Sequence, residues 1–223
     1  MSPETQASSP KKSPFYKNPW LIAFLSGAAA LTILPLLQTF AMKAPPPVAS
    51  LGEWRLVDQD GATLSSESLK GQVWIASFFF SRCPSVCPTQ QGDFKKILDH
   101  VADLESPDKK PIRLVSFSVD PAFDTPAVLQ AYATKFAAPK DLWTFATGDE
   151  AALKELLVKR MFIDVGEKVP LPGNPEVFDI GHVQKFVLID QNGDVRGYWN
   201  TDELARGNLV NAARLVWKRG PKV

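Results

Sequence analysis

The chain contains only two cysteines, and they lie four residues apart directly after an apolar run. Residues Val73 to Phe80 are apolar at nearly every position, as is typical of a strand covered on both faces. After the cysteines, apolar residues recur at helical spacing, at Phe94, Ile97, Leu98, Val101 and Leu104. The sequence therefore places Cys83 and Cys87 where a buried strand passes into the N-terminus of a helix.

This position favours thiolate chemistry. Pro88 suits the first turn of a helix, because backbone N–H groups there have no partner within the helix and proline lacks an N–H. The positive end of the helix dipole favours a thiolate, and Arg82 acts in the same direction unless it points to solvent. If residues 83–87 turn helically, their i,i+4 spacing puts both sulfurs on one face. The pair then closes a disulfide or holds one soft metal ion, and its spacing is CxxxC rather than CxxC.

Length, charge and cysteine count exclude several classes of protein. The 223 residues suffice for one domain with a sizeable core and an appendage. The net charge of +1 comes from mixed charges, so no nucleic-acid surface is expected. Two cysteines are too few for a disulfide-rich scaffold.

The N-terminal region predicts a membrane anchor. Residues 1–18 are polar and are expected to form a disordered cytoplasmic tail, and their lack of Arg argues against a mitochondrial transit peptide. Residues 19–42 carry no charge and are long enough for a transmembrane helix, with the preceding lysines keeping the N-terminus inside. A cleaved signal peptide is the alternative, although its apolar region is usually only about 7–15 residues long. Residues 43–50 form a Pro-rich spacer.

Residues 51–217 predict one α/β domain. The expected strands are 53–57, 73–80, 112–119, 143–146, 185–189 and 197–199. The expected helices begin after the cysteines, after Thr125, at Glu150 and at Thr201, with Thr201 as the N-cap of the last helix. Residues 161–181 contain several prolines and are expected to be mainly a long excursion. The order predicts a sandwich with a central mixed sheet flanked by helices, and the cysteines at the C-terminal end of a central strand.

The two histidines have different expectations. His100 lies within the first helix of the domain, where a solvated or packing role is expected. His182 follows the excursion and precedes a strand. Its position alone favours an ordinary surface residue.

Several segments together resemble the Sco/SenC/PrrC family. They are Phe79 to Pro88, Ser116 to Pro126 (SFSVDPAFDTP), Trp143 to Gly148, and Gly181-His182 before a strand ending in Leu188-Ile189-Asp190. The N-terminal anchor fits as well, and the resemblance spans about residues 48–217. CxxxCP, the SVDPxxDTP segment and the distal His form a specific combination, whereas each alone is weak.

The resemblance implies a thioredoxin-like fold and a copper site, Cu(I) or Cu(II), formed by Cys83, Cys87 and His182. It implies a metallochaperone that delivers copper to the CuA-bearing subunit of cytochrome c oxidase, with another copper chaperone or a thioredoxin-like reductant as a further partner. The expected location is the bacterial inner membrane, single-pass, with the C-terminal domain in the periplasm. Soft thiolates select Cu(I), and one imidazole also accommodates Cu(II).

The sequence departs from the family pattern at two positions. Gly181 stands where the family usually has Asp, and Ser85 where an acidic residue often lies between the cysteines. Fewer negative charges should leave Cu(II) less stabilised. Asp120 and Asp124 match family positions, but a purely structural role is equally open, with Asp120 closing a strand and Asp124 helping to cap a helix.

Two other functions remain open. The first is a periplasmic thiol–disulfide oxidoreductase, in which Cys83 and Cys87 are the redox pair. The CxxxC spacing and the absence of proline at residues 183–184, where thioredoxin-like oxidoreductases carry a cis-proline, argue against an ordinary enzyme of that kind. The second is an anchored redox sensor or binding module with a structural Cys83–Cys87 disulfide.

Overall fold

The computed structural model describes residues 19–41, 43–84, 86–104, 106–171, 174–182 and 184–220, and the chain divides into two units between Lys43 and Ala44. The first unit contains helix α1, Pro19–Ala41, so the predicted helix is present. Over the described residues, no helix has the combined length and apolar character that crossing a membrane requires, and the predicted transmembrane segment is not confirmed. The expected tail, residues 1–18, lies outside the described residues.

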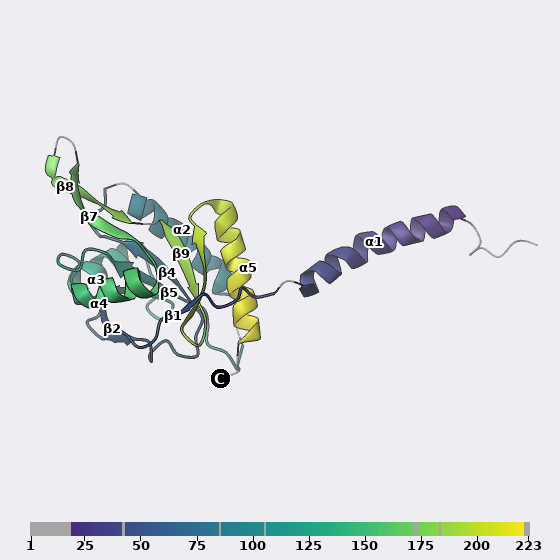
Figure 1. Ribbon diagram of the computed structural model, residues 1–223, viewed down its shortest axis with the longest axis horizontal. Helices are drawn as coiled ribbons and strands as arrows, with labels where there is room; N and C mark the ends of the chain where they lie inside the picture. The colour runs from purple at the N-terminus through teal and green to yellow at the C-terminus, as the bar shows by residue number, and fades with distance from the viewer. Residues whose placement is uncertain are drawn as a thin grey trace, which may run out of the picture. The chain divides into compact units, whose positions relative to one another are not determined.

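The second unit is built on an eight-stranded mixed sheet with the order β1-β10-β9-β4-β5-β6-β2-β3 (Figure 1). Strands β4, β5 and β6 are parallel, whereas β9 pairs antiparallel with β4 and β10 pairs antiparallel with β9. The strands are Ala49–Ser50, Arg55–Asp58, Thr63–Ser65, Trp74–Phe79, Arg113–Ser118, Trp143–Thr147, Lys185–Ile189 and Asp194–Asn200, for β1 to β6, β9 and β10. The predicted α/β sandwich with a central mixed sheet is confirmed.

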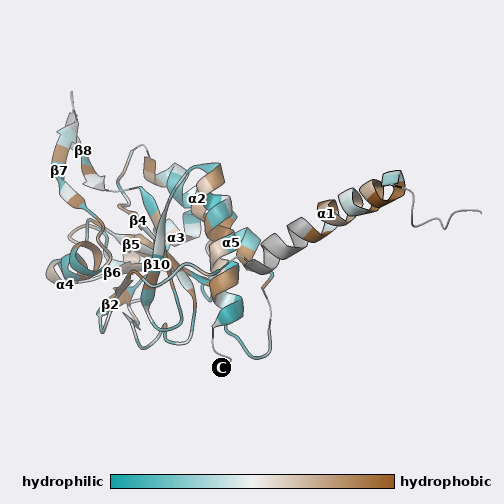
Figure 2. Cartoon of the chain, turned by 45° about the vertical axis from the view of Figure 1, so that its right-hand side comes forward, coloured by the Kyte–Doolittle hydropathy of each residue, from teal (hydrophilic) through white to brown (hydrophobic). Residues whose placement is uncertain are grey.

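Strand β4 is buried throughout because helices cover both faces of the sheet. Its six residues are all buried: Ile75 and Phe79 point into one cluster, and Trp74 and Phe78 into the other. Helices α2, α3 and α5 contribute to the first cluster, and α4 with the π-helical turn η2 contributes to the second. These elements are Val86–Val101, Pro126–Lys135, Glu203–Arg219, Glu150–Lys154 and Glu155–Arg160. In Figure 2, brown and teal alternate along α5, as a helix with one buried face requires.

Two predictions of local structure are wrong. Residues 161–181 are not mainly an irregular excursion, because β7 (Val165–Leu171) and β8 (Asn174–His182) pair antiparallel in a separate two-stranded sheet. Each strand of an isolated pair has one free edge, so prolines without an N–H are tolerated there. The last helix is capped by Asp202 rather than Thr201, since the Asp202 side chain accepts the Ala205 N–H at 3.0 Å.

Candidate metal centre

The two cysteines lie side by side at the junction of β4 and α2. Cys83 follows β4 in a tight loop, where its N–H donates to the Phe80 carbonyl at 3.1 Å, and Cys87 lies in the first turn of α2. The Cys87 N–H donates to Sγ of Cys83 at 3.4 Å. No disulfide joins them, and the exposed fractions of Cys83 and Cys87 are 6% and 0%. The helix N-terminus thus presents an amide donor to one sulfur and buries both.

The pair retains a proton on Cys87. A hydrogen bond with the Cys83 side chain is the largest cause that raises the pKa of Cys87, and burial is the second. The negative charge of Asp179, in β8, acts in the same direction. Binding of a metal ion by both sulfurs must therefore displace this proton, because the thiolate is the ligand form.

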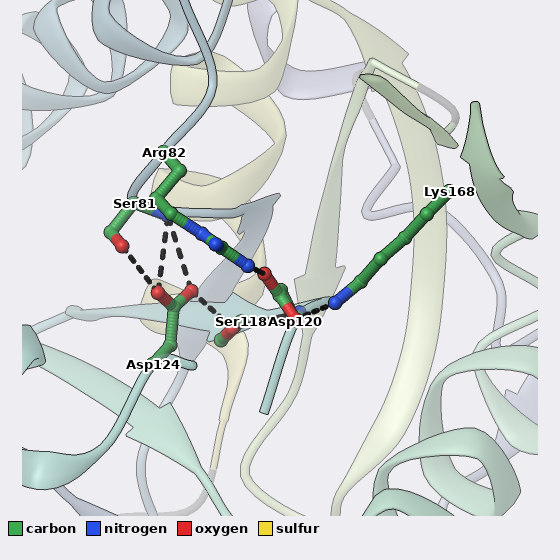
Figure 3. Close-up of polar contacts among 6 residues, drawn as sticks. All are labelled: Ser81, Arg82, Ser118, Asp120, Asp124 and Lys168. Carbon is green, nitrogen blue, oxygen red and sulfur yellow. Dashed lines mark hydrogen bonds and ion pairs between the residues drawn. The ribbon is translucent and has the colours of Figure 1, made fainter. Parts of the chain in front are cut away.

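Arg82, the residue before Cys83, forms an ion pair with a buried carboxylate. Its Nη2 lies 2.7 Å from Oδ2 of Asp120, which is 1% exposed, and its guanidinium lies 3.8 Å from the centroid of the Phe123 ring. Lys168 of β7 contacts the other carboxylate oxygen of Asp120 with Nζ at 2.6 Å (Figure 3). Asp120 thus binds one cation beside the cysteines and a second on the β7–β8 hairpin.

Asp124 fixes the cysteine loop to β5 rather than capping a helix. Its carboxylate accepts the Ser81 N–H at 3.1 Å, the Ser118 hydroxyl at 2.5 Å and the Ser81 hydroxyl (Figure 3). Burial raises the pKa of Asp124, and the serine hydrogen bonds only partly offset this. Thr125 caps α3 instead, since its side chain accepts the Val128 N–H. The capping role considered for Asp124 is therefore wrong.

A buried polar cluster supports the helix that carries Cys87. Ser77 of β4 and Ser116 of β5 are paired across the strands, with their hydroxyl oxygens 2.8 Å apart. The Ser116 hydroxyl donates to Gln91 Oε1 of α2 at 2.9 Å and accepts the indole N–H of Trp143 at 2.9 Å. The only signal in the sequence is a serine within each of two apolar strands. The partners of those serines could not be read from it.

The structure places the two histidines apart. His182 is the last residue of β8 and lies opposite Val165, and its side chain lies outside what the structure describes. His100 is exposed near the end of α2, as expected for a solvated residue. Among the described residues, no group of three or more His, Cys, Asp and Glu side chains could hold a metal ion. Ser85 also lies outside the described residues.

The fold and the cysteine pair together define a thioredoxin-like α/β domain with a buried dithiol at the start of a helix that covers the sheet. The two thiols supply soft ligands, which suit Cu(I). The SCO1/SenC family model matches residues 43–216, and the chain belongs to this family.

Individual relatives agree with this assignment. The SCO1 protein homolog of Bacillus subtilis is 33% identical over 147 residues, which make up 64% of this chain and 69% of that protein. The structure of BsSco matches with a TM-score of 0.64 at 25% identity, over 80% of this chain and 99% of its own. BsSco is described as having a disulfide switch and as a member of the Sco family of cytochrome c oxidase assembly proteins. Copper-bound ScoI of Bradyrhizobium japonicum has the same fold, with a TM-score of 0.60 at 24% identity over 75% of this chain and 99% of its own.

Proposed function

We propose that this chain binds one copper ion through Cys83, Cys87 and His182 and delivers it to the CuA-bearing subunit of cytochrome c oxidase. The observation that carries the proposal is the buried pair of cysteines, reduced and adjacent, in which the Cys87 N–H donates to the Cys83 sulfur at 3.4 Å. Membership of a family with copper-bound structures supports the choice of metal. Two thiolates favour Cu(I), and an added imidazole extends the site to Cu(II).

The chain's own residues have separate tasks in this function. Cys87 gives up its proton when the ion enters, so binding releases acid and strengthens as the pH rises. Cys83 keeps the amide hydrogen bond from the helix N-terminus, which orients its sulfur. His182 comes from the separate β7–β8 sheet, so strand pairing does not fix this ligand to the element that carries the cysteines.

Copper titration of the full chain, reduced and metal-free, tests the proposal. We expect one equivalent of Cu(II) to produce a thiolate-to-copper charge-transfer band, and we expect Cys83→Ser and His182→Ala to lose it. His100→Ala is the matched control, because that exposed imidazole lies on α2 and its loss should change nothing. Weak binding by the unmodified chain, or a band that survives His182→Ala, would contradict the proposal.

Thiol–disulfide exchange is a second candidate, favoured by two reduced cysteines one helical turn apart. Two thiols would close a Cys83–Cys87 disulfide while a partner disulfide accepts two electrons and two protons to become two thiols. An insulin-reduction assay and a measured reduction potential separate this reaction from metal transfer. Rapid turnover without tight copper binding would favour the exchange.

We propose that the protein is a single-pass protein of the bacterial inner membrane, with residues 44–223 in the periplasm. This rests on the 23-residue helix α1, which contains no charged residue. Alkaline extraction of membranes tests it, since an integral protein stays in the pellet. Release into the supernatant would overturn the anchor without affecting the copper proposal.

A further inference from the structure

Within the described part of the chain, the β7–β8 hairpin, which carries His182, does not pair with the main sheet. It forms a sheet of its own and stands out from the body of the domain in Figure 1. A strand within a sheet is positioned by its backbone ladder, but this hairpin must be positioned by side chains. Which contacts hold it therefore decides where the end of β8 lies.

One of these contacts is apolar and reaches the cysteines. Ile180, two residues before His182, is 3% exposed and belongs to the same buried cluster as Cys83 and Cys87. Asp179 beside it lies close enough for its charge to act on the Cys87 thiol. Strand β8 thus passes next to the dithiol.

The second contact is ionic and comes from the facing strand. Lys168 of β7 pairs with Ile180 in the hairpin register, and its Nζ lies 2.6 Å from Oδ1 of Asp120. Next to this contact the hairpin is not packed closely, since a cavity of about 280 Å³ lies between Val165 to Lys168 on one side and Val119, Leu153 and Lys154 on the other. Val165 packs against the core at the start of β7, and the ion pair of Lys168 with Asp120 adds a polar contact three residues further on, beside the cavity.

Asp120 joins the hairpin to the cysteine loop. It is 1% exposed, and its two oxygens are divided between Lys168 and Arg82, the residue before Cys83 (Figure 3). A buried carboxylate is strongly destabilised without cations, so it holds both partners to itself. The Ser118 hydroxyl accepts the Asp120 N–H at 3.0 Å and fixes the backbone at this point.

We propose that Asp120 is a positioning residue whose ion pairs with Lys168 and Arg82 hold the β7–β8 hairpin, and with it His182, against the cysteine loop. The inference rests on the proposed copper site, because it assigns a cause to the placement of its third ligand. Breaking the Lys168 contact frees the hairpin while the two cysteines keep their places on the β4–α2 junction. We call the Lys168–Asp120 ion pair the latch, because it connects the hairpin that carries His182 to the loop that carries the cysteines.

Hydrogen exchange of the full, metal-free chain tests the latch without copper. Lys168→Met keeps most of the apolar stem and removes the charge, and we expect faster amide exchange over residues 165–182 with no change in β4 or α2. Glu167→Gln is the matched control. Glu167 lies next to Lys168 on β7 and forms no ion pair within the described part of the chain. Lys168→Arg should restore slow exchange. Equal exchange in Lys168→Met and the unmodified chain would overturn the latch.

Copper affinity tests whether the latch acts through His182. Because Lys168 is partly exposed, we expect Lys168→Met to weaken Cu(II) binding by about threefold to tenfold, measured by competition with a chelator. In a His182→Ala background the same substitution should have no effect, because the ligand it positions is absent. An equal factor in both backgrounds would refute the link to His182.

The two proposals fail separately. If the unmodified chain binds no copper while Lys168→Met still loosens residues 165–182, the copper function is wrong and the latch stands. If copper binds tightly but Lys168→Met changes neither the amide exchange of residues 165–182 nor the copper affinity, the latch is wrong and the copper function stands.

Discussion

Removing the Asp124 carboxylate should destabilise the domain more than removing any exposed acid. Asp124 is 0% exposed and accepts hydrogen bonds from the Ser81 N–H, the Ser81 hydroxyl and the Ser118 hydroxyl. In Asp124→Ala the hydroxyls can rotate to other acceptors, but the Ser81 N–H cannot. Hydrogen bonds to a charged group contribute about 1.5–3 kcal/mol each, and the desolvation of the carboxylate offsets part of their sum.

We therefore expect Asp124→Ala to lower the free energy of unfolding by about 3 kcal/mol and Asp124→Asn by about 1–2 kcal/mol, since an amide keeps one acceptor oxygen. For a domain of this size, about 3 kcal/mol corresponds to a fall in Tm of about 6–12 °C. Urea denaturation and calorimetry measure both quantities. Asp99→Asn, an exposed acid on α2, is the control and should stay within about 0.5 kcal/mol.

The pH dependence provides an independent check. Burial raises the pKa of Asp124 in the folded state above its unfolded value of about 3.9. The folded state then holds a proton at a pH where the unfolded state has lost it. The resulting stabilisation is complete below about pH 4 and disappears as the pH rises through the folded pKa. The stability of the unmodified chain relative to Asp124→Asn should thus grow on acidification from pH 7 to 4. A difference that shrinks, or a loss below about 1 kcal/mol in Asp124→Ala, would refute this account of the site.

Three further substitutions test other parts of the structure. Ser116→Ala should destabilise the domain by about 2–3 kcal/mol in urea denaturation, because it leaves the indole N–H of Trp143 without its acceptor in the core; no loss would mean that this bond has no net effect. Tyr132→Phe should leave the free energy of unfolding unchanged or raise it by up to about 1 kcal/mol, since the buried hydroxyl has no hydrogen-bond partner among the described residues. A clear loss of stability would show that this hydroxyl does form a hydrogen bond. Gly181→Asp should strengthen Cu(II) binding by about threefold to tenfold in chelator competition, because a Cβ there meets nothing within 4 Å and the added carboxylate stabilises the higher charge; unchanged Cu(II) affinity would show that this position does not affect the site.

Local sequence determined the elements that surround the candidate site. The apolar run Val73 to Phe80 predicted β4, because a strand buried on both faces is apolar at nearly every position. The helical spacing of apolar residues after Cys87 predicted α2, because a helix buried on one face is apolar only at every third or fourth position. The positions of both cysteines at this junction followed from that pattern. Residues 161–181 were misjudged because proline and glycine mark irregular chain and isolated two-stranded ladders alike.

Only the tertiary structure decided the polar contacts around the cysteines. Asp120 meets Arg82 across 38 residues and Lys168 across 48, and Asp124 meets Ser81 across 43. Periodicity reports whether a side chain is buried, but it carries no information on which distant residue faces it. That choice depends on the parallel register of β4 and β5 and on the placement of a separate hairpin, and both arise only when the whole domain packs.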